Sequence, residues 1–84
     1  MPVELDIRRR RAAYRAQHRG TKEMDVLIGR FAVVRLDGLD ETGLALIEEF
    51  LAVPDPLLEA WIFGKESPDS IYAPLVREVR VFHG

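Results

Sequence analysis

One short polar stretch, residues 19–25 (Arg-Gly-Thr-Lys-Glu-Met-Asp), most constrains how this chain can fold. The segment before it is basic and rich in good helix formers, and the segment after it carries apolar residues at helical spacing. Gly20 separates the two patterns, and a glycine can adopt a positive φ at little cost. We therefore expect a helix–turn–helix corner, flanked by two charges, Arg19 and Glu23, that the turn itself does not need.

Turn and breaker residues divide the rest of the chain into further short helical patterns. The predicted helices are 4–18, 22–36, a third capped by Asp40, a fourth from the cap Asp55-Pro56 to Gly64, and a fifth that opens at 67–70. Pro74 must then lie in the first turn of the fifth helix. Residues 76–82 also fit a short strand, but no second strand is evident to pair with it. The sequence therefore predicts an all-α fold, a small single-domain bundle of about five short helices over residues 1–84.

The apolar spacing predicts which side of each helix faces the core. Ile7 and Tyr14 are expected on one face of the first helix, and Trp61 is expected as a core anchor, with an interface role as the alternative. The other expected core residues are Met24, Leu27, Ile28, Phe31, Val34 and Leu36 in the second helix, Leu44, Ile47, Phe50 and Leu51 in the third, and Ile71, Leu75, Val79 and Phe82 in the fifth.

Composition and charge narrow the class of protein. Charged residues make up 31% of the chain, cysteine is absent, and no apolar run approaches the roughly 18 residues of a membrane span. Residues 1–37 hold nine basic against five acidic residues, and residues 38–84 hold three against nine. Such polarity can orient a partner during encounter. Because the first six residues lack the apolar segment of a signal peptide, we expect a bacterial protein of the cytoplasm. We also expect it to be a monomer and not to insert into membranes.

No constellation typical of an enzyme occurs in the sequence. His18 and His83 are the only histidines and lack metal-site spacing, and no nucleophile motif or phosphate-binding glycine loop is present. Glu23 and Asp25 are two residues apart on a helix and point to different faces, so they form a poor acid–base pair. We therefore expect an interaction protein without a catalytic set, a metal or a cofactor of its own.

Two alternatives concern the charged residues. The basic first helix, with consecutive arginines at 8–11, could contact the phosphates of a nucleic acid or serve as a generic protein-interaction surface, but no base-reading helix accompanies it. Arg19 and Glu23 could form an ion pair that only fixes the angle of the corner. Alternatively, the corner projects into the cleft of a partner, where Gly20 permits close backbone approach and the two charges form directed hydrogen bonds.

Two motifs carry a resemblance to a known family. Residues 18–25 (His-Arg-Gly-Thr-Lys-Glu-Met-Asp), preceded by Arg-Ala-Ala-Tyr-Arg at 11–15, resemble the Arg-Gly-x-x-Glu signature of the succinate dehydrogenase assembly factor family. Residues 55–61 (Asp-Pro-Leu-Leu-Glu-Ala-Trp) are similar to that family's Asp-Pro-x-Leu-x-x-Trp segment. The resemblance covers most of the chain and implies a small helical protein that promotes covalent attachment of FAD to the flavoprotein subunit.

The resemblance also implies a partner and contact residues. It implies binding to the flavoprotein subunit of succinate dehydrogenase, with the related subunit of fumarate reductase as a second candidate, and not to nucleic acid. Arg19, Gly20 and Glu23 match the motif and are the expected contacts, with Asp25 and His18 beside them. Some relatives carry a second basic residue at the position of His18, which itself lacks a permanent charge. The implied mechanism is positioning, achieved by selecting one conformer of the flavoprotein.

Overall fold

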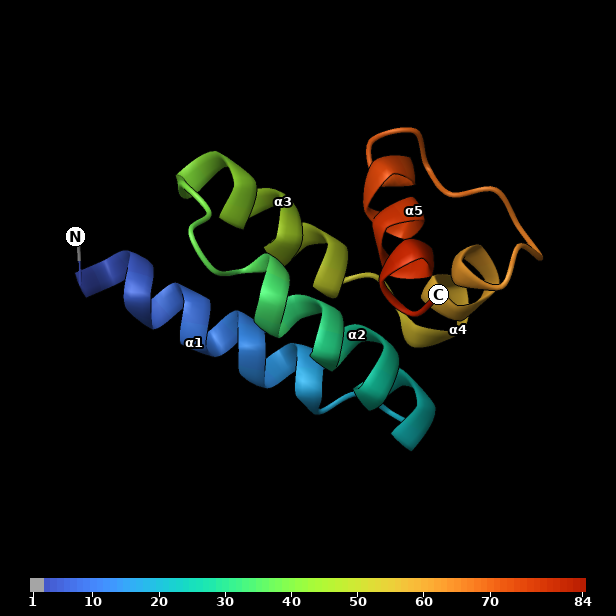
Figure 1. The fold of residues 1–84 in the computed structure, drawn as a ribbon, viewed down its shortest axis with the longest axis horizontal. Helices are drawn as coiled ribbons and strands as arrows, with labels where there is room; N and C mark the ends of the chain where they lie inside the picture. Colours follow the sequence, from blue (N-terminus) through green and yellow to red (C-terminus); the bar gives the residue numbers. More distant parts are fainter. Residues whose placement is uncertain (1–2) are drawn as a thin grey trace.

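The computed structural model describes residues 3–84, which form five α-helices and contain no strand (Figure 1). The connections are short except for the loop 63–72 between the last two helices. The helices are α1 (Val3–Gln17), α2 (Lys22–Arg35), α3 (Glu41–Leu51), α4 (Asp55–Ile62) and α5 (Ala73–Phe82). The predicted all-α fold is confirmed. No helix in the described part of the chain combines the length and the apolarity that crossing a bilayer requires.

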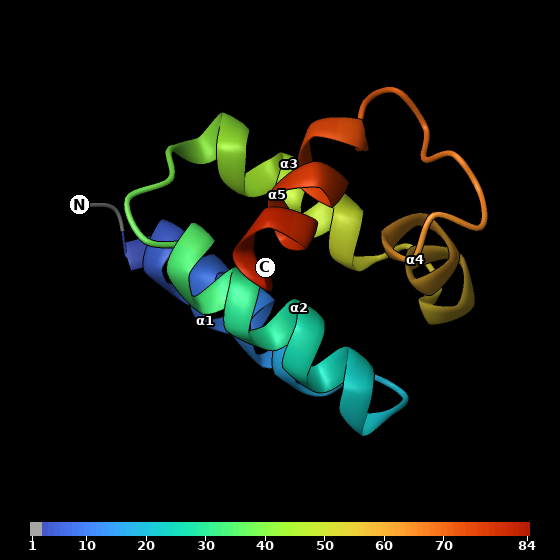
Figure 2. The same cartoon turned by 45° about the vertical axis from the view of Figure 1, so that its right-hand side comes forward.

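The helices pack as two groups that share α2. Helices α1 and α2 run in opposite directions as a pair, and α3 packs against α1 (Figure 1). Helix α5 packs against both α4 and α2 (Figure 2). The molecule measures 39 × 26 × 23 Å along its principal axes. In both views the α1–α2 corner and α4 lie at the end of the molecule opposite the start of α1, so residues 19–25 are close in space to the segment that begins at residue 55.

Small residues bring α1 and α2 close together. Ala12 and Ala16 are buried on the α1 side, and Gly29 is buried on the α2 side. A Cβ added at Gly29 would lie only 3.1 Å from the Cα of Gln17, so this contact is made backbone to backbone. The expected apolar face of α1 is therefore wrong: Tyr14 is 63% exposed, because α1 turns its alanines inward and leaves no room for a large ring.

The buried core draws residues from all five helices. Within α2, most of the predicted face is confirmed, although Leu27 is only partly buried and Val34 is exposed. Trp61 is 3% exposed and stacks on Tyr72 with ring centroids 5.9 Å apart, which confirms its core position. The core residues are Ala12, Ala16, Met24, Ile28, Phe31, Ala32, Leu36, Leu44, Ile47, Phe50, Leu51, Leu58, Trp61, Ile62, Leu75, Val76 and Val79.

The local signals at the helix ends are mostly confirmed. The Thr21 hydroxyl accepts a hydrogen bond from the Met24 N–H at 3.2 Å, and the Asp40 carboxylate accepts one from the Gly43 N–H at 2.8 Å. Gly64 follows α4 with a φ of +77°, as its predicted stop position suggests. Pro74 lies in the first turn of α5, as expected.

The predicted core stripe of the last helix is only half correct. Leu75 and Val79 are buried together with Val76, whereas Ile71 is exposed and Phe82 is 43% exposed. Residues 70–72 form a turn, and α5 begins only at Ala73. Ile71 therefore precedes the helix and cannot continue its periodic face. Phe82 lies at the other end of α5, where it makes an edge contact with the ring of Phe31.

Candidate partner-binding site at the α1–α2 corner

The Arg19 side chain faces its own protein and not the solvent. Its Nε donates a hydrogen bond to Oδ1 of Asp55 at 2.8 Å, and the two groups form an ion pair. Its terminal nitrogens donate to the carbonyl oxygens of Leu51 at 2.7 Å and Val53 at 3.1 Å. Only 9% of the side chain is exposed. Arg19 thus joins the α1–α2 corner to the connection between α3 and α4, and it satisfies carbonyls that the end of α3 leaves unpaired.

Two carboxylates fix the backbone of the corner. Asp55 uses its second oxygen, Oδ2, to accept a hydrogen bond from the Gly20 N–H at 2.7 Å. Asp25 accepts a hydrogen bond from the Arg19 N–H, so the start of α2 is tied back to the residue before the turn. We call the four residues Arg19, Gly20, Asp25 and Asp55 the corner bracket. The bracket fixes the direction in which the N-terminal end of α2 projects.

The structure corrects three expectations about these residues. Gly20 does not adopt a positive φ; a Cβ there would lie 3.0 Å from Oδ2 of Asp55, so close approach is what the site requires. Arg19 pairs with Asp55 and not with Glu23, so the alternative in which those two charges form the corner is wrong. Asp55 does not cap α4, whose cap position is Pro54, because the Asp55 carboxylate is used by Arg19 and Gly20.

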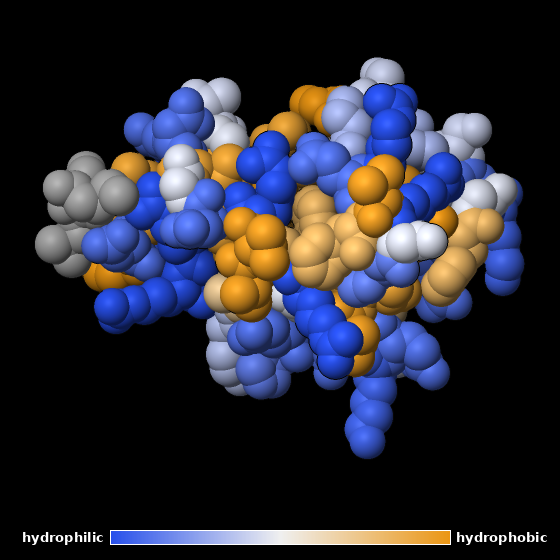
Figure 3. Space-filling model, viewed as in Figure 1, coloured by the Kyte–Doolittle hydropathy of each residue, from blue (hydrophilic) through white to orange (hydrophobic). Residues whose placement is uncertain are grey.

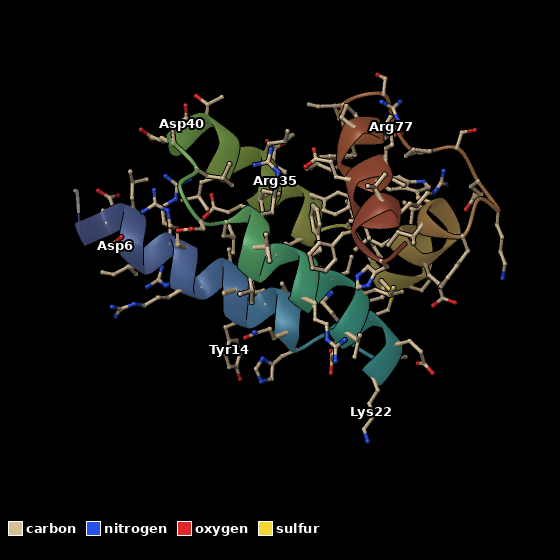
Figure 4. The ribbon with its side chains drawn as sticks, viewed as in Figure 1. Asp6, Tyr14, Lys22, Arg35, Asp40 and Arg77 are labelled. Atoms are coloured by element: carbon tan, nitrogen blue, oxygen red, sulfur yellow. The ribbon has the colours of Figure 1, made fainter. Side chains whose placement is uncertain are left out.

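Glu23 points outward from the first turn of α2. It is exposed, and its side chain makes no hydrogen bond or ion pair within residues 3–84. Its neighbour Lys22 extends away from the body of the molecule at the start of α2 (Figure 4). Glu23 also lines an open hollow of about 440 Å³ with Lys22, Val26, Leu27 and Phe63. The corner therefore presents an uncommitted carboxylate beside exposed apolar surface.

His18 lies on the outer side of α1. Its ring stacks on that of Tyr14 with centroids 3.9 Å apart, and both residues are exposed. Tyr14 points outward from α1 (Figure 4). The Nδ1 atom of His18 lies 2.8 Å from the Tyr14 carbonyl oxygen, so Nδ1 carries the proton that is donated and Nε2 faces away from this bond. His18 is thus presented beside the corner and is not part of the bracket.

A second hollow lies beside the bracket. It has a volume of about 570 Å³ and is lined by residues of the corner and of α4. The residues that line it are Gly20, Thr21, Met24, Asp55, Pro56, Glu59, Ala60 and Lys65. Its wall contains both acidic and basic side chains, and it is open to solvent next to the turn.

The basic first helix is partly neutralised by the protein itself. The Arg8 guanidinium donates two hydrogen bonds to the Glu48 carboxylate of α3, at 2.6 and 3.2 Å. These hydrogen bonds lower the pKa of Glu48 and raise that of Arg8. Arg9 donates to the Asp6 carboxylate and to the Leu39 carbonyl. These two arginines therefore join α1 to α3 and to the connection before it.

The sequence predicted the helix–turn–helix corner. It did not show which residues of the corner contact the rest of the chain and which face the solvent. Asp55 was expected as a helix cap, although it stands in the second family-like motif, at 55–61, and that co-occurrence was a signal for its link to residues 19–20. Nothing in the sequence marked Phe63, which is 58% exposed beside Glu23. No cluster of three or more metal-ligating side chains occurs among residues 3–84.

Comparisons with known proteins point to one family. Residues 10–83 match the model of the family described as the flavinator of succinate dehydrogenase. An FAD assembly factor SdhE from Acetobacter pasteurianus is 41% identical over 76 residues, which cover 89% of this chain and 70% of that protein. The protein of the same name from Legionella pneumophila (strain Paris) is 34% identical over 62 residues, covering 74% of this chain and 78% of that protein.

A eukaryotic relative shares the same region. The mitochondrial succinate dehydrogenase assembly factor 2 of Dictyostelium discoideum is 31% identical over 78 residues, which cover 92% of this chain and 55% of that protein. No solved structure matches the chain.

Proposed function

This chain belongs to the succinate dehydrogenase flavinator family, and from that premise we propose that it binds the flavoprotein subunit through the outer side of the α1–α2 corner. As a member of the family it is an assembly factor that promotes attachment of FAD to succinate dehydrogenase. The contact residues are Glu23 and His18, and the corner bracket holds them in place.

One observation carries this assignment. The corner is held by at least five hydrogen bonds of the bracket, yet Glu23 at its tip makes none within residues 3–84. Because the backbone that carries Glu23 is already fixed, a partner that binds this carboxylate has to order only the side chain. Arg19 and Asp25 then act inside the chain, by setting the direction of α2, and Gly20 keeps the turn narrow enough for Asp55 to reach it.

The proposed mechanism is positioning. The covalent bond forms between FAD and a histidine of the flavoprotein, so the reacting groups belong to the partner. A helix corner that fits one conformer of the flavoprotein raises the population of that conformer. Holding reacting groups in a productive geometry can remove several kcal/mol of the barrier, on the order of 7–11 kcal/mol in the best cases. This chain is accordingly proposed to be no enzyme and to carry no FAD of its own.

The test is covalent flavinylation in cells that lack their own factor. The flavoprotein is expressed with the wild-type chain or with Glu23→Gln, which keeps the size of the side chain and removes its charge. Flavin fluorescence of the denatured flavoprotein in a gel then reports the covalent bond. We expect fluorescence with the wild-type chain and a loss of at least about tenfold with Glu23→Gln, the usual effect of losing a charge-assisted hydrogen bond at an interface.

A matched control separates function from folding. Glu49→Gln changes another exposed glutamate, on α3, that makes no side-chain hydrogen bond within residues 3–84. It should support flavinylation like the wild type. Both variants should melt within about 4 °C of the wild type, since exposed substitutions change stability by about 0.5 kcal/mol or less. Equal fluorescence with Glu23→Gln and Glu49→Gln would contradict the role of Glu23.

Three further parts of the proposal have separate measurements. The same assay with the flavoprotein of fumarate reductase tests whether that subunit is also served. Light scattering of the purified chain tests the proposal that it works as a monomer. Fractionation of bacterial cells tests the proposal that it acts in the cytoplasm. Isolated chain that retained stoichiometric FAD after purification would contradict the proposal that the flavoprotein alone carries it.

A further inference from the structure

The outer side of α2 is unusually apolar for a solvent-exposed helix face. Val26, Val33 and Val34 of α2 and Val81 and Phe82 at the end of α5 are each between 42% and 75% exposed. We call these five residues the valine face. Figure 3 shows apolar atoms gathered over α2 and the end of α5, with hydrophilic atoms around them. Valine is a weaker helix former than the polar residues usual at such positions, so helix propensity does not account for these exposed valines.

The valine face is continuous and hollowed. Val34 lines three open hollows of about 440, 450 and 510 Å³, and Phe82 lines two of them. Each hollow is lined mainly by apolar surface. Contiguous exposed apolar surface rimmed by polar groups is typical of a protein-interaction site.

Most of the charged side chains around the valine face are basic, and most of these basic side chains make no hydrogen bond or ion pair within residues 3–84. Arg10, Arg30 and Arg77 line the three hollows and make no side-chain hydrogen bond or ion pair within residues 3–84. Arg35 and Glu78 also lie at the rim, but they bind each other at 2.8 Å. Two further acidic residues lie at the rim: Asp37, which makes no side-chain hydrogen bond or ion pair in the described part of the chain, and Asp25, which accepts the Arg19 backbone N–H. The rim therefore favours a ligand that combines apolar and acidic side chains.

The valine face also continues into the corner. Val26 lines both the hollow beside Glu23 and the hollow that contains Val33 and Val34. Glu23 and Val26 are three residues apart and therefore neighbours on the surface of α2. A protein that touched Glu23 at the tip of the corner would meet the valine face directly along the same helix.

We propose that the valine face is a second docking surface for the flavoprotein subunit, and that it binds an acidic amphipathic segment of that subunit. The inference rests on the proposed function and extends it from the corner to the length of α2. A helix that lays its apolar side on a hydrophobic groove is a common mode of recognition. The acidic residues of such a segment would meet Arg10, Arg30 and Arg77, so the rim selects the orientation and speeds association.

A second copy of this chain fits the valine face less well. Two copies that met through this face would bring the three uncommitted arginines of each rim together, and like charges at an interface cost affinity. The overall formal charge of −2 does not offset this repulsion, because the acidic excess lies in residues 38–84 and not on the outer side of α2. Charge complementarity therefore favours a different, acidic partner.

The experiment measures binding of the purified flavoprotein subunit to the wild-type chain and three variants. Val34→Glu places a charge at the centre of the face, and Arg30→Glu reverses a rim charge. Ile71→Glu is the matched control, since Ile71 is 56% exposed but lies outside the valine face. We expect Val34→Glu and Arg30→Glu each to raise Kd at least about tenfold, and Ile71→Glu to change it by less than about twofold. Wild-type affinity should also fall at high salt.

Each result decides the proposal. Wild-type binding that Val34→Glu and Arg30→Glu leave unchanged overturns the valine face as a docking surface and leaves the corner intact. A wild-type chain that does not bind the flavoprotein overturns both this inference and the proposed function. If light scattering shows a dimer that Val34→Glu dissociates, with no change in flavoprotein affinity for the monomer, the occupant is a second copy and the proposal is wrong. Circular dichroism of each variant verifies that the helices are intact.

Discussion

Two arginines, Arg19 and Arg80, perform a similar task at two helix ends but in different surroundings. Arg80 of α5 donates to the carbonyl oxygens of Trp61 and Ile62 at the end of α4. Arg19 does the same for Leu51 and the adjoining connection at the end of α3. Arg80 lies on an exposed edge, whereas the Arg19 side chain is almost completely buried and is paired with a carboxylate. Arg80 thus only caps the end of a helix, whereas Arg19 also fixes the α1–α2 corner.

The difference follows from the second residue at each site. Asp55 neutralises Arg19 and also holds the Gly20 N–H, so one carboxylate connects the α3–α4 connection to the backbone of the corner. No carboxylate is paired with Arg80 within the described residues. Removing the partner of a buried charge destabilises a protein far more than removing the partner of an exposed charge, because water cannot solvate the buried charge. The two arginines should therefore respond very differently to the same truncation.

The largest effect is expected for Arg19→Ala. It leaves Oδ1 of Asp55 and the carbonyl oxygens of Leu51 and Val53 without their donor, and we expect a loss of about 3 kcal/mol in the free energy of unfolding, or roughly 12–24 °C in Tm. Urea denaturation followed by circular dichroism measures it. Flavinylation should be lost as well, but together with stability, unlike the loss expected for Glu23→Gln. An Arg19→Ala protein as stable as the wild type would show that the bracket does not hold the corner.

Asp55→Asn should have the next largest effect. The asparagine keeps the shape of the side chain but loses the charge, and its amide group faces donors on Arg19 or Gly20. We expect a loss of about 2 kcal/mol. In a double-mutant cycle with Arg19→Ala, a coupling energy above about 0.5 kcal/mol would place the two residues in one network. Additive losses would mean that the ion pair contributes little and would remove the main contrast with Arg80.

Arg80→Ala should cost less, about 1 kcal/mol, because its interaction is with helix-end carbonyls at an exposed edge. The same urea titration measures it, and flavinylation should remain at the wild-type level. A loss as large as that of Arg19→Ala would contradict the idea that burial and the carboxylate distinguish the two sites.

Local signals predicted most of the fold, and long-range contacts account for the errors. Thr21 and Asp40 act as helix caps because their partners lie three residues away. Asp55 has an equally good local cap signal, but its carboxylate binds Arg19, 36 residues earlier, instead of capping α4. No pattern around Asp55 alone contains that information. The Arg-Gly-x-x-Glu motif marked the position of the α1–α2 corner, while the inward direction of Arg19 depends on where the end of α3 lies.

The face of α1 was mispredicted for a related reason. Hydrophobic spacing gives weight to large side chains, so Tyr14 was expected inside. The α1–α2 contact is instead made through Ala12, Ala16 and Gly29, which hydrophobic spacing ranks low. Close backbone approach between helices is a property of the pair, and neither helix shows it alone. The same limit applies to Val34, whose exposure depends on the position of α5.

A third arginine, Arg8, gives the smallest effect and completes the comparison. It binds Glu48 of α3 with both side chains partly exposed, and its hydrogen bonds lower the pKa of Glu48 from an ordinary value of 4.5. A carboxylate with a lowered pKa stabilises the fold above its unfolded pKa, and this contribution disappears as the pH falls through the folded pKa. Arg8→Gln should therefore reduce stability near pH 7 and lose less on acidification below about pH 4.5 than the wild type does. Urea titrations of both proteins at neutral and acidic pH measure the difference. Because partly exposed ion pairs contribute little, the loss of stability should be smaller than that for Arg80→Ala. If the stability of both proteins changed with pH in parallel, Arg8 and Glu48 would not be coupled in solution.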